Sequence, residues 1–173
     1  VQSKKSDIIE TLGIIRKHYY LLTLHRPYNV DNPSNLKSIL DKIGQLQSPV
    51  IFPLHPRTKK VILQNNLILN SNIKIIDPLS YLDFLCLQLN AQKIITDSGG
   101  IQKEAYILNK PCITIRPETE WIETVINGWN ILLNPIKKSF LDSIDNFNPS
   151  GKNQNIFGKN VAKKMVNLIK KSN

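Results

Sequence analysis

The sequence of 173 residues contains only two cysteines, one methionine and two tryptophans. Cys86 and Cys112 each lie within an apolar stretch, and their separation matches no zinc-binding motif. We therefore expect both thiols to be buried and reduced, as in a cytoplasmic protein. No apolar run approaches the roughly 18 residues that a membrane-spanning helix needs, so we expect no membrane partner.

Several common catalytic signatures are also missing from the sequence. It has neither the Gly-x-Gly-x-x-Gly fingerprint of dinucleotide sites nor the Gly-Lys-Ser/Thr of a Walker loop. The nucleophile elbow Gly-x-Ser-x-Gly is absent, and no group of potential ligands has metal-binding spacing. These absences argue against a serine hydrolase and against a metal centre.

Acidic residues are scarce relative to basic ones, 13 against 23, which gives a formal net charge of +10. Residues 137–173 hold much of this excess, with eight lysines against Asp142 and Asp145. This region has no arginine and few aromatic residues, whereas nucleic-acid sites interleave aromatic and basic side chains. We interpret it as a solvated surface and expect no nucleic-acid partner.

The sequence alternates short apolar runs with amphipathic segments of helical length. Six runs predict strands, at residues 19–23, 50–53, 73–76, 93–96, 112–115 and 129–133. Because these runs are continuous rather than alternating, they indicate an α/β fold, a Rossmann-like parallel sheet with helices on both faces. We also expect a loop over 146–155 and a last helix over about 159–171.

Capping residues mark the start of two of the predicted helices. Asn32 can cap a helix over 35–46, with Pro33 at its first position. Ser80, with an aspartate three residues later, resembles a capping box before a helix over 82–89. In the latter helix the spacing predicts a buried face made of Leu82, Leu85, Cys86 and Leu89.

The strongest local signal is the turn Asp97-Ser98-Gly99-Gly100, which follows an apolar strand and opens a helix. Paired glycines let backbone amides approach a ligand, and a helix N-terminus favours anions such as phosphate. Ser98 can add a hydroxyl donor, and Glu104 can accept hydrogen bonds from a ribose. The alternative is an ordinary strand-to-helix turn capped by Asp97 or Ser98.

Histidine and arginine residues follow several of the predicted strands. His25 and Arg26 come after the first strand, His55 and Arg57 after the second, and Arg116 after the fifth. The carboxyl ends of parallel strands meet at one edge, where open α/β sheets bind ligands. His25 can act as an acid, a base or a phosphate donor, although a histidine that merely caps a turn is the alternative.

The segment after the fifth strand also carries three carboxylates, at positions 118, 120 and 123. Thr119 or Glu120 can lie over a bound nucleotide. The alternative is an acidic first helical turn, which the helix dipole favours. His18 precedes the first strand, at the opposite edge, and is interpreted as a surface or structural residue.

Together these motifs resemble the non-hydrolysing UDP-N-acetylglucosamine 2-epimerases, two-domain enzymes with the glycosyltransferase-B fold. The matching segments are 23–26 with Asn29, 55–58, 77–84, 96–105, 110–111, 116–120, 128–130, and 157–159 with Ala162. The resemblance implies interconversion of UDP-GlcNAc and UDP-ManNAc without a cofactor, by elimination and re-addition of UDP. It further implies a homodimer in the full-length enzyme.

The resemblance also assigns roles to residues of this chain. His25 matches an active-site histidine near the diphosphate, and Arg26 and His55 match a contact to a second, activating nucleotide-sugar molecule in some bacterial members. Residues that match the family's contacts to the uracil, diphosphate and ribose of UDP are Leu79, Phe84, Ser98, Gly99, Gly100 and Glu104.

The chain departs from the family pattern at two positions. Trp121 stands where many members have an arginine that touches the diphosphate, and Tyr28 stands where the family often has glutamate. The tryptophan points to a subfamily with a different UDP-sugar.

The resemblance covers only the family's C-terminal half, so we expect residues 1–173 to be a UDP-binding C-terminal domain. The carboxylates that act on the sugar belong to the family's N-terminal domain and cannot be located in this sequence. By itself the chain is expected to bind UDP-sugar weakly without turning it over. The alternatives are a UDP-sugar glycosyltransferase domain of the same fold and an inactive UDP-binding fragment.

Overall fold

The computed structural model describes residues 6–149, 153, 154 and 156–158. Six parallel strands form one sheet in the order β3-β2-β1-β4-β5-β6. The strands are β1 (Tyr20–Thr23), β2 (Val50–Pro53), β3 (Ile73–Ile76), β4 (Lys93–Thr96), β5 (Cys112–Thr114) and β6 (Asn130–Leu132). All six predicted strands are confirmed, and the predicted ends of β1, β5 and β6 extend one residue beyond the observed strands.

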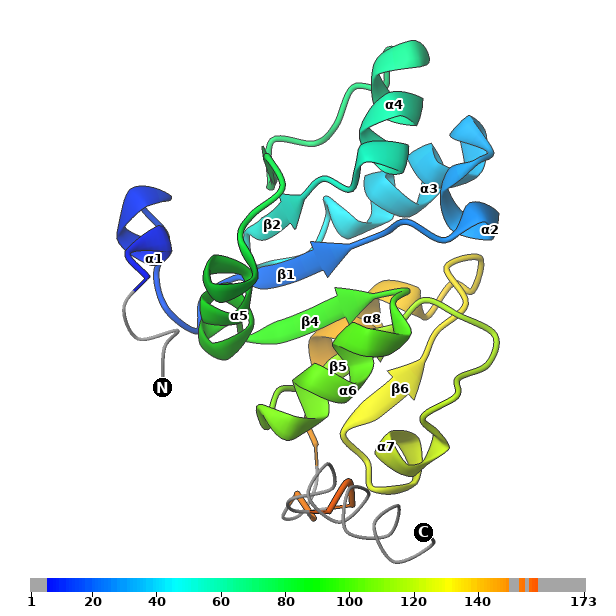
Figure 1. The fold of residues 1–173 in the computed structure, drawn as a ribbon. Coiled ribbons are helices and arrows are strands. Elements are labelled where there is room, and N and C mark those ends of the chain that lie inside the picture. Colours follow the sequence, from blue (N-terminus) through cyan, green and yellow to red (C-terminus); the bar gives the residue numbers. More distant parts are fainter. Residues whose placement is uncertain (1–5, 150–152, 155, 159–173) are drawn as a thin grey trace, which may run out of the picture.

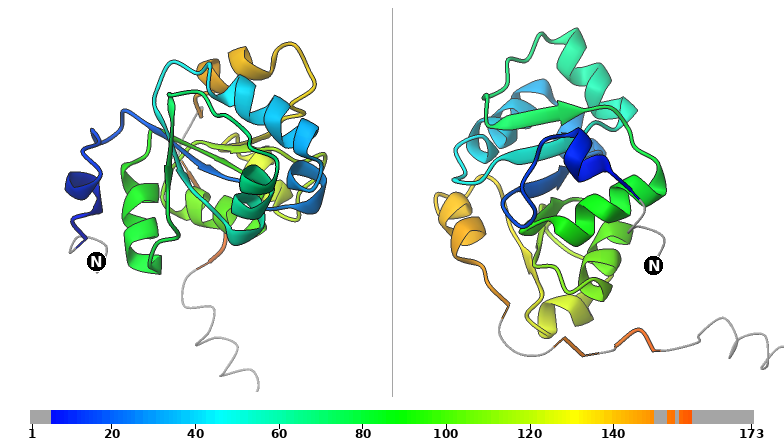
Figure 2. Two further views of the ribbon diagram at one scale, coloured as in Figure 1. Left: turned by 90° about the horizontal axis from the view of Figure 1, so that it is seen from above. Right: turned by 90° about the vertical axis from the view of Figure 1, so that its left-hand side faces the viewer.

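Helices cover both faces of this sheet, as Figures 1 and 2 show, which confirms the predicted Rossmann-like architecture. On one face lie α3 (Pro33–Ile43), α4 (Pro56–Gln64) and α8 (Phe140–Asn146). On the other lie α1 (Ile8–Thr11), α5 (Tyr81–Asn90) and α6 (Gly99–Ile107). Two short helices, α2 (Pro27–Val30) and α7 (Ile122–Ile126), follow β1 and β5.

Consecutive residues of the first strand enter different hydrophobic clusters. Tyr20 and Leu22 pack with α3, α4 and α8, whereas Tyr19 and Leu21 pack with α1, α5 and α6. All four residues are buried, Leu21 and Leu22 completely, with 0% exposure. A strand covered on both faces must be apolar at every position, which explains the continuous run in the sequence.

The sheet order reverses between β1 and β4, whose residues pair from Tyr20 with Lys93 to Thr23 with Thr96. The connection from β1 leads outward to β2, whereas the connection from β4 leads to β5 on the other side. At such a switch point the loops diverge and leave a crevice at the carboxyl ends of the strands. The residues that follow Thr23 and Thr96 therefore face one another.

Lys93, at the start of β4, is buried although lysine rarely is. Its ammonium donates hydrogen bonds to the carbonyl oxygens of Ile144 and Asp145, each at 2.7 Å. Burial lowers the pKa of Lys93, and the nearby Asp145 carboxylate opposes that effect. These bonds fasten the carboxyl end of α8 to the centre of the sheet.

Two predicted helix starts are confirmed. The Asn32 side chain accepts hydrogen bonds from the amides of Ser34 and Asn35, and the helix begins at Pro33. The Ser80 hydroxyl accepts from the Asp83 amide and caps α5. These side chains satisfy amides that have no partner within their helix.

The predicted buried face of α5 is wrong in part. Leu82 is 41% exposed, whereas Leu87, which the prediction left outside that face, is fully buried. The helix is turned so that Cys86 and Leu87 pack in the core cluster on this face of the sheet, and the buried Gln88 amide reaches Glu104 of α6. The predicted last helix over 159–171 lies outside the described residues, as does part of the predicted loop over 146–155.

Among the described residues, no helix combines the length and the apolar character needed to cross a bilayer.

Truncation of Leu22 tests how far the sheet depends on its central strand. We expect Leu22→Ala to lower the free energy of unfolding by about 2–5 kcal/mol, because it leaves a cavity in a fully packed core. Leu63→Ala, at a side chain that is 65% exposed, provides the matched control with a change below about 0.5 kcal/mol. Urea denaturation measures both, and equal effects of the two variants would contradict this account of the core.

Candidate functional site

Asp97 follows β4 and has a fully buried side chain, with 0% exposure. Its carboxylate accepts hydrogen bonds from the amides of His25 at 3.1 Å and Arg26 at 2.9 Å, and from Asn29 Nδ2 at 3.0 Å. Asp97 therefore ties the loop after β1 to the turn after β4. The predicted alternative in which Asp97 caps α6 is wrong, because its oxygens are directed at the other loop.

Asn29 extends this connection to a third strand. Its Nδ2 also donates to the carbonyl oxygen of Ile115, directly after β5, at 3.0 Å. Beside it, the hydroxyls of Thr23 and Thr96 lie 2.6 Å apart at the ends of β1 and β4. The loops after β1, β4 and β5 are thus held together by buried polar side chains, whose hydrogen bonds offset the cost of removing them from water.

The His25 ring lies at the mouth of this crevice. Its Nδ1 is 3.2 Å from Asp97 Oδ1, and its centroid is 5.2 Å from that of His55. Burial lowers the pKa of His25, Asp97 opposes this effect, and the neighbouring charges of His55, Arg26 and Arg57 add to it. The His25 ring is therefore mostly neutral at pH 7.

His55 is the histidine that caps a helix. It precedes α4, and its Nδ1 accepts a hydrogen bond from the Arg57 amide at 3.2 Å. Arg57 itself is turned away from the crevice and pairs with Asp31, with Nη2 and Oδ2 2.6 Å apart. Of the arginines predicted at this edge, Arg57 thus contributes to local structure.

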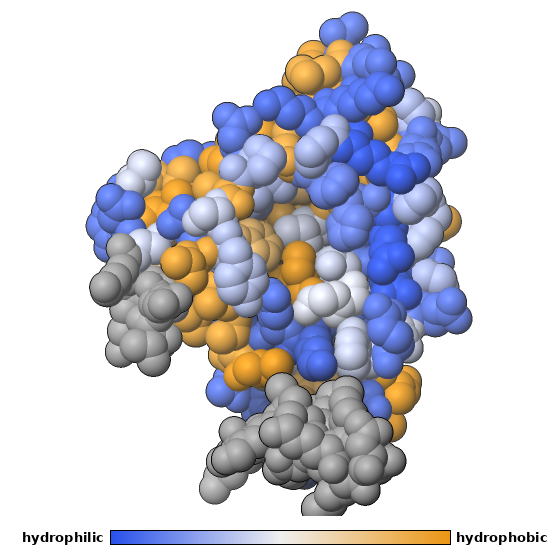
Figure 3. Space-filling view, in the orientation of Figure 1, coloured by the Kyte–Doolittle hydropathy of each residue, from blue (hydrophilic) through white to orange (hydrophobic). Residues whose placement is uncertain are grey.

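A pocket of about 260 Å³ opens beside His25. It is lined by Thr23, Leu24, His25, Pro53, Leu54, His55, Pro56, Pro78, Leu79, Phe84 and Ile101. The space-filling view of Figure 3, in the orientation of Figure 1, shows a hollow in the middle of the surface, where apolar side chains lie between polar ones. The structure therefore brings together four of the predicted site residues: His25, His55, Leu79 and Phe84.

The predicted strand-turn-helix at residues 97–100 is confirmed, since α6 begins at Gly99 directly after β4. Ser98 is the N-cap residue, and within the described part of the chain its hydroxyl makes no capping hydrogen bond. Among the described residues, the amides of Gly99 and Gly100 donate no hydrogen bond. Ile101, in the first turn of α6, lines the pocket beside His25, so pocket and helix start adjoin.

Glu104 lies further along α6 and does not line that pocket. Its Oε2 accepts a hydrogen bond from the buried Gln88 amide at 2.6 Å, and the side chain is half-buried. Arg26 Nε donates to the carbonyl oxygen of Asp97 at 3.3 Å, which places that side chain beside the turn. The sequence did not identify Gln88 as the partner that holds Glu104.

The loop after β5 is fixed to α6 and reaches over its start. The Thr119 hydroxyl donates to Gln102 Oε1 at 2.6 Å, and Arg116 Nη1 lies 2.6 Å from Glu120 Oε2. A Cβ on Gly99 would overlap Oε1 of Glu120, so this carboxylate lies close against the first residue of α6. The loop thus brings Thr119 and Glu120 to the start of α6, and their contact with a nucleotide stays a prediction.

Trp121 turns away from the helix start. Lys103 Nζ lies 4.7 Å from the centre of its ring, and the ring packs edge-on against Phe157 with centroids 5.5 Å apart. Trp121 therefore serves as a packing residue that links the loop to α6 and to the segment around Phe157.

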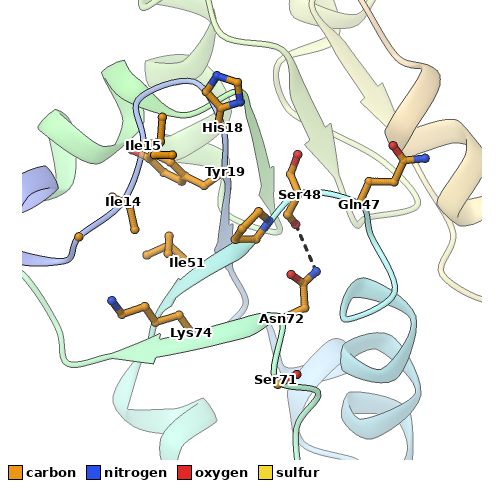
Figure 4. Close-up of a pocket in the computed structure, with 12 residues that line it drawn as sticks. Ile14, Ile15, His18, Tyr19, Gln47, Ser48, Ile51, Ser71, Asn72 and Lys74 are labelled. Carbon is orange, nitrogen blue, oxygen red and sulfur yellow. Dashed lines mark hydrogen bonds between the residues drawn. The ribbon is translucent and has the colours of Figure 1, made fainter.

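A larger cavity, of about 600 Å³, lies at the opposite edge of the sheet, between β1, β2 and β3 (Figure 4). Ile14, Tyr19 and Ile51 line it together with His18 and Lys74. Of the three histidines only His18 lines this cavity, and none of the predicted site residues does. Its volume alone does not make it the functional site. The described residues hold no group of three or more His, Cys, Asp or Glu placed to bind a metal ion.

Comparison with known proteins gives the site a context. A family model described as UDP-N-acetylglucosamine 2-epimerase matches residues 1–170. A UDP-N-acetylglucosamine 2-epimerase homolog of Methanococcus maripaludis is 43% identical over 176 residues, which cover 98% of this chain and 49% of that protein. A UDP-2,3-diacetamido-2,3-dideoxy-D-glucuronate 2-epimerase of Pseudomonas aeruginosa is 41% identical over 128 residues, which cover 72% of this chain and 36% of that protein.

Solved structures agree with these relatives. The Methanocaldococcus jannaschii UDP-GlcNAc 2-epimerase, in complex with UDP-GlcNAc and UDP, is 39% identical and has a TM-score of 0.86. The match covers 99% of this chain and 50% of that one. The chain therefore spans about half the length of the curated relatives and of this structure, and its fold is the C-terminal half of the glycosyltransferase-B fold.

Replacing the Asp97 carboxylate by an amide tests its role as the tie between loops. We expect Asp97→Asn to lower the free energy of unfolding by about 2–4 kcal/mol, because buried donors lose their acceptor. Asp31→Asn makes the same change in an exposed pair and should cost less than about 1 kcal/mol. Denaturant titration measures the free energy of unfolding of both variants. An Asp97→Asn variant as stable as Asp31→Asn would refute the role of Asp97 as the tie between the loops.

The protonation of His25 can be followed directly. Since burial lowers its pKa, the His25 ring signal should titrate with a midpoint below the ordinary value of about 6.5. Proton NMR over a pH series, with the signal assigned by its loss in His25→Gln, measures this midpoint. A midpoint above the ordinary value would show that attraction to Asp97 outweighs burial.

Proposed function

The chain belongs to the UDP-N-acetylglucosamine 2-epimerase family, and from this membership we propose that it is the UDP-binding half of a two-domain UDP-sugar 2-epimerase. The observation that carries the proposal is the convergence of three features at the β1–β4 switch point. These are the His25 ring, the apolar pocket of Leu79 and Phe84, and the uncapped start of α6. Each suits a different part of a nucleoside diphosphate.

We propose that the uracil occupies the pocket between Leu79 and Phe84. Its volume of about 260 Å³ and its apolar lining suit a planar base. The diphosphate lies at the start of α6, where Ser98 and the amides of Gly99 and Gly100 donate to its oxygens. Glu104, held by Gln88, accepts from the ribose hydroxyls.

In the proposed reaction this half of the enzyme holds the leaving group. His25 and the donors of α6 stabilise the negative charge that develops on UDP when the bond to the sugar breaks. Moving a proton at C2 of the sugar requires carboxylates within hydrogen-bond reach. In the proposal these come from the other half, so the chain alone binds UDP-sugar without converting it. His55 and Arg26 contact a second nucleotide-sugar molecule beside the first.

The sugar is proposed to be UDP-N-acetylglucosamine or a related UDP-2-acetamido sugar. Relatives named for UDP-N-acetylglucosamine and for a UDP-diacetamido-glucuronate are similarly close to the chain, at 43% and 41% identity. Both reactions invert C2, so the reaction type is the common feature. The complete enzyme is further proposed to be a cytoplasmic homodimer without a nucleic-acid partner.

Isothermal titration calorimetry of the chain with UDP tests the binding role. We expect Ser98→Ala and His25→Ala each to raise the Kd about fivefold or more, because each removes a donor to the diphosphate. Ser71→Ala and His18→Ala make the same substitutions at the opposite edge and should leave the Kd unchanged. Wild-type chain that takes up no UDP, or four variants of equal affinity, would overturn the assignment.

A further inference from the structure

The start of α6 already carries an anion, the side chain of Glu120. Its Oε1 stands so close to Gly99 that a Cβ on that residue would overlap it. The positive end of a helix dipole stabilises a carboxylate at this position. Glu120 therefore lies beside the first residue of α6, whose amide the proposed function gives to the diphosphate.

Arginine side chains complete the surroundings of this carboxylate. Arg116 Nη1 lies 2.6 Å from Glu120 Oε2, and the Arg116 side chain is only 14% exposed. A hydrogen bond to its own backbone lowers the pKa of Glu120, partial burial opposes this, and the pair with Arg116 and the charge of Arg26 lower it further. The helix start, Arg116 and Arg26 together form an anion site that the chain fills with its own carboxylate.

The residues on either side of Glu120 are held by hydrogen bonds, whereas its own side chain is partly exposed to solvent. Thr119 is bonded to Gln102 of α6, and the Trp121 amide donates to the Thr119 hydroxyl at 3.0 Å. The Glu120 side chain itself is 44% exposed. A rotation about its own side-chain bonds can therefore clear the helix start without moving the loop.

We propose that the UDP diphosphate displaces the Glu120 carboxylate and takes over its ion pair with Arg116, which makes Arg116 a phosphate-binding residue and Glu120 an internal competitor. This inference rests on the proposed function of the same site. It also accounts for Trp121, which stands where many family members have an arginine but packs against Lys103 and Phe157. Arg116 supplies a guanidinium to the cradle from five positions earlier in the loop.

Electrostatic attraction favours the replacement of the Glu120 carboxylate by the diphosphate. A diphosphate carries more negative charge and more acceptor oxygens than one carboxylate, and a guanidinium binds phosphate with two parallel hydrogen bonds. The cost is the Glu120–Arg116 pair, which must break first and so lowers the affinity for UDP. Uridine has no phosphate and binds without this exchange.

Calorimetry with UDP and with uridine on matched variants tests the inference. We expect Glu120→Gln to tighten UDP binding about threefold to tenfold, because the competing charge is gone. Arg116→Met should weaken UDP binding about tenfold or more, because the phosphate loses its ion pair. Glu118→Gln removes the same charge from an exposed neighbour and should change nothing, and uridine should bind all four proteins equally.

The outcomes separate this inference from the function on which it rests. UDP binding by the wild-type chain with no change in Glu120→Gln and Arg116→Met would overturn the inference alone. Weaker UDP binding in Glu120→Gln would show that the carboxylate supports the ligand and would overturn it as well. Absence of UDP binding by the folded wild-type chain would overturn the proposed function and this inference together. Should Arg116→Met not fold, Arg116→Lys keeps the charge, and a weakened affinity for UDP but not for uridine is still required.

Discussion

The buried carboxylate of Asp97 holds together the edge of the sheet at the carboxyl ends of β1, β4 and β5. Its oxygens accept hydrogen bonds from the backbone amides of His25 and Arg26 and from the side-chain amide of Asn29. These bonds fix the positions of all three residues. Asn29 also donates to the carbonyl oxygen of Ile115, so the loop after β5 is held in the same network. Three loops from different parts of the sequence consequently have one relative position. A phosphate site made of backbone amides and side chains from separate strands depends on such rigidity.

The sequence was sufficient for the sheet because the buried strands are mostly apolar, as in β1, and because glycine, proline and asparagine mark the turns. The strand ends also placed His25 and His55 at one edge, since the carboxyl ends of parallel strands must meet there, and the family resemblance added Leu79 and Phe84. It could not give the rotation of α5, which buries Leu87 in the core cluster and brings Gln88 to Glu104 of α6. Pairings of this kind depend on tertiary packing that a local pattern does not contain.

The division between the two halves of the family's enzymes follows from the kind of work each performs. Holding a nucleotide needs apolar walls and donors fixed on rigid elements, and this chain has both at the β1–β4 switch point. Near the crevice, the carboxylates of Asp97 and Glu104 already accept hydrogen bonds from the protein itself. In the proposed function this domain retains UDP during catalysis, while the other domain supplies the carboxylates that move the proton at C2 of the sugar.

Lys93 limits how far the chain can be shortened at its C-terminal side without destabilising the domain. Its ammonium is buried in the sheet and finds its acceptors at the carboxyl end of α8, more than fifty residues later. A shorter chain that stopped after β6 would keep this ammonium in the core and remove the carbonyl oxygens that accept its hydrogen bonds, a loss that buried ions tolerate badly. The segment from 140 to 146 is thus an integral part of the domain, and evolutionary shortening or recombination of the chain has to keep β4 and α8 together.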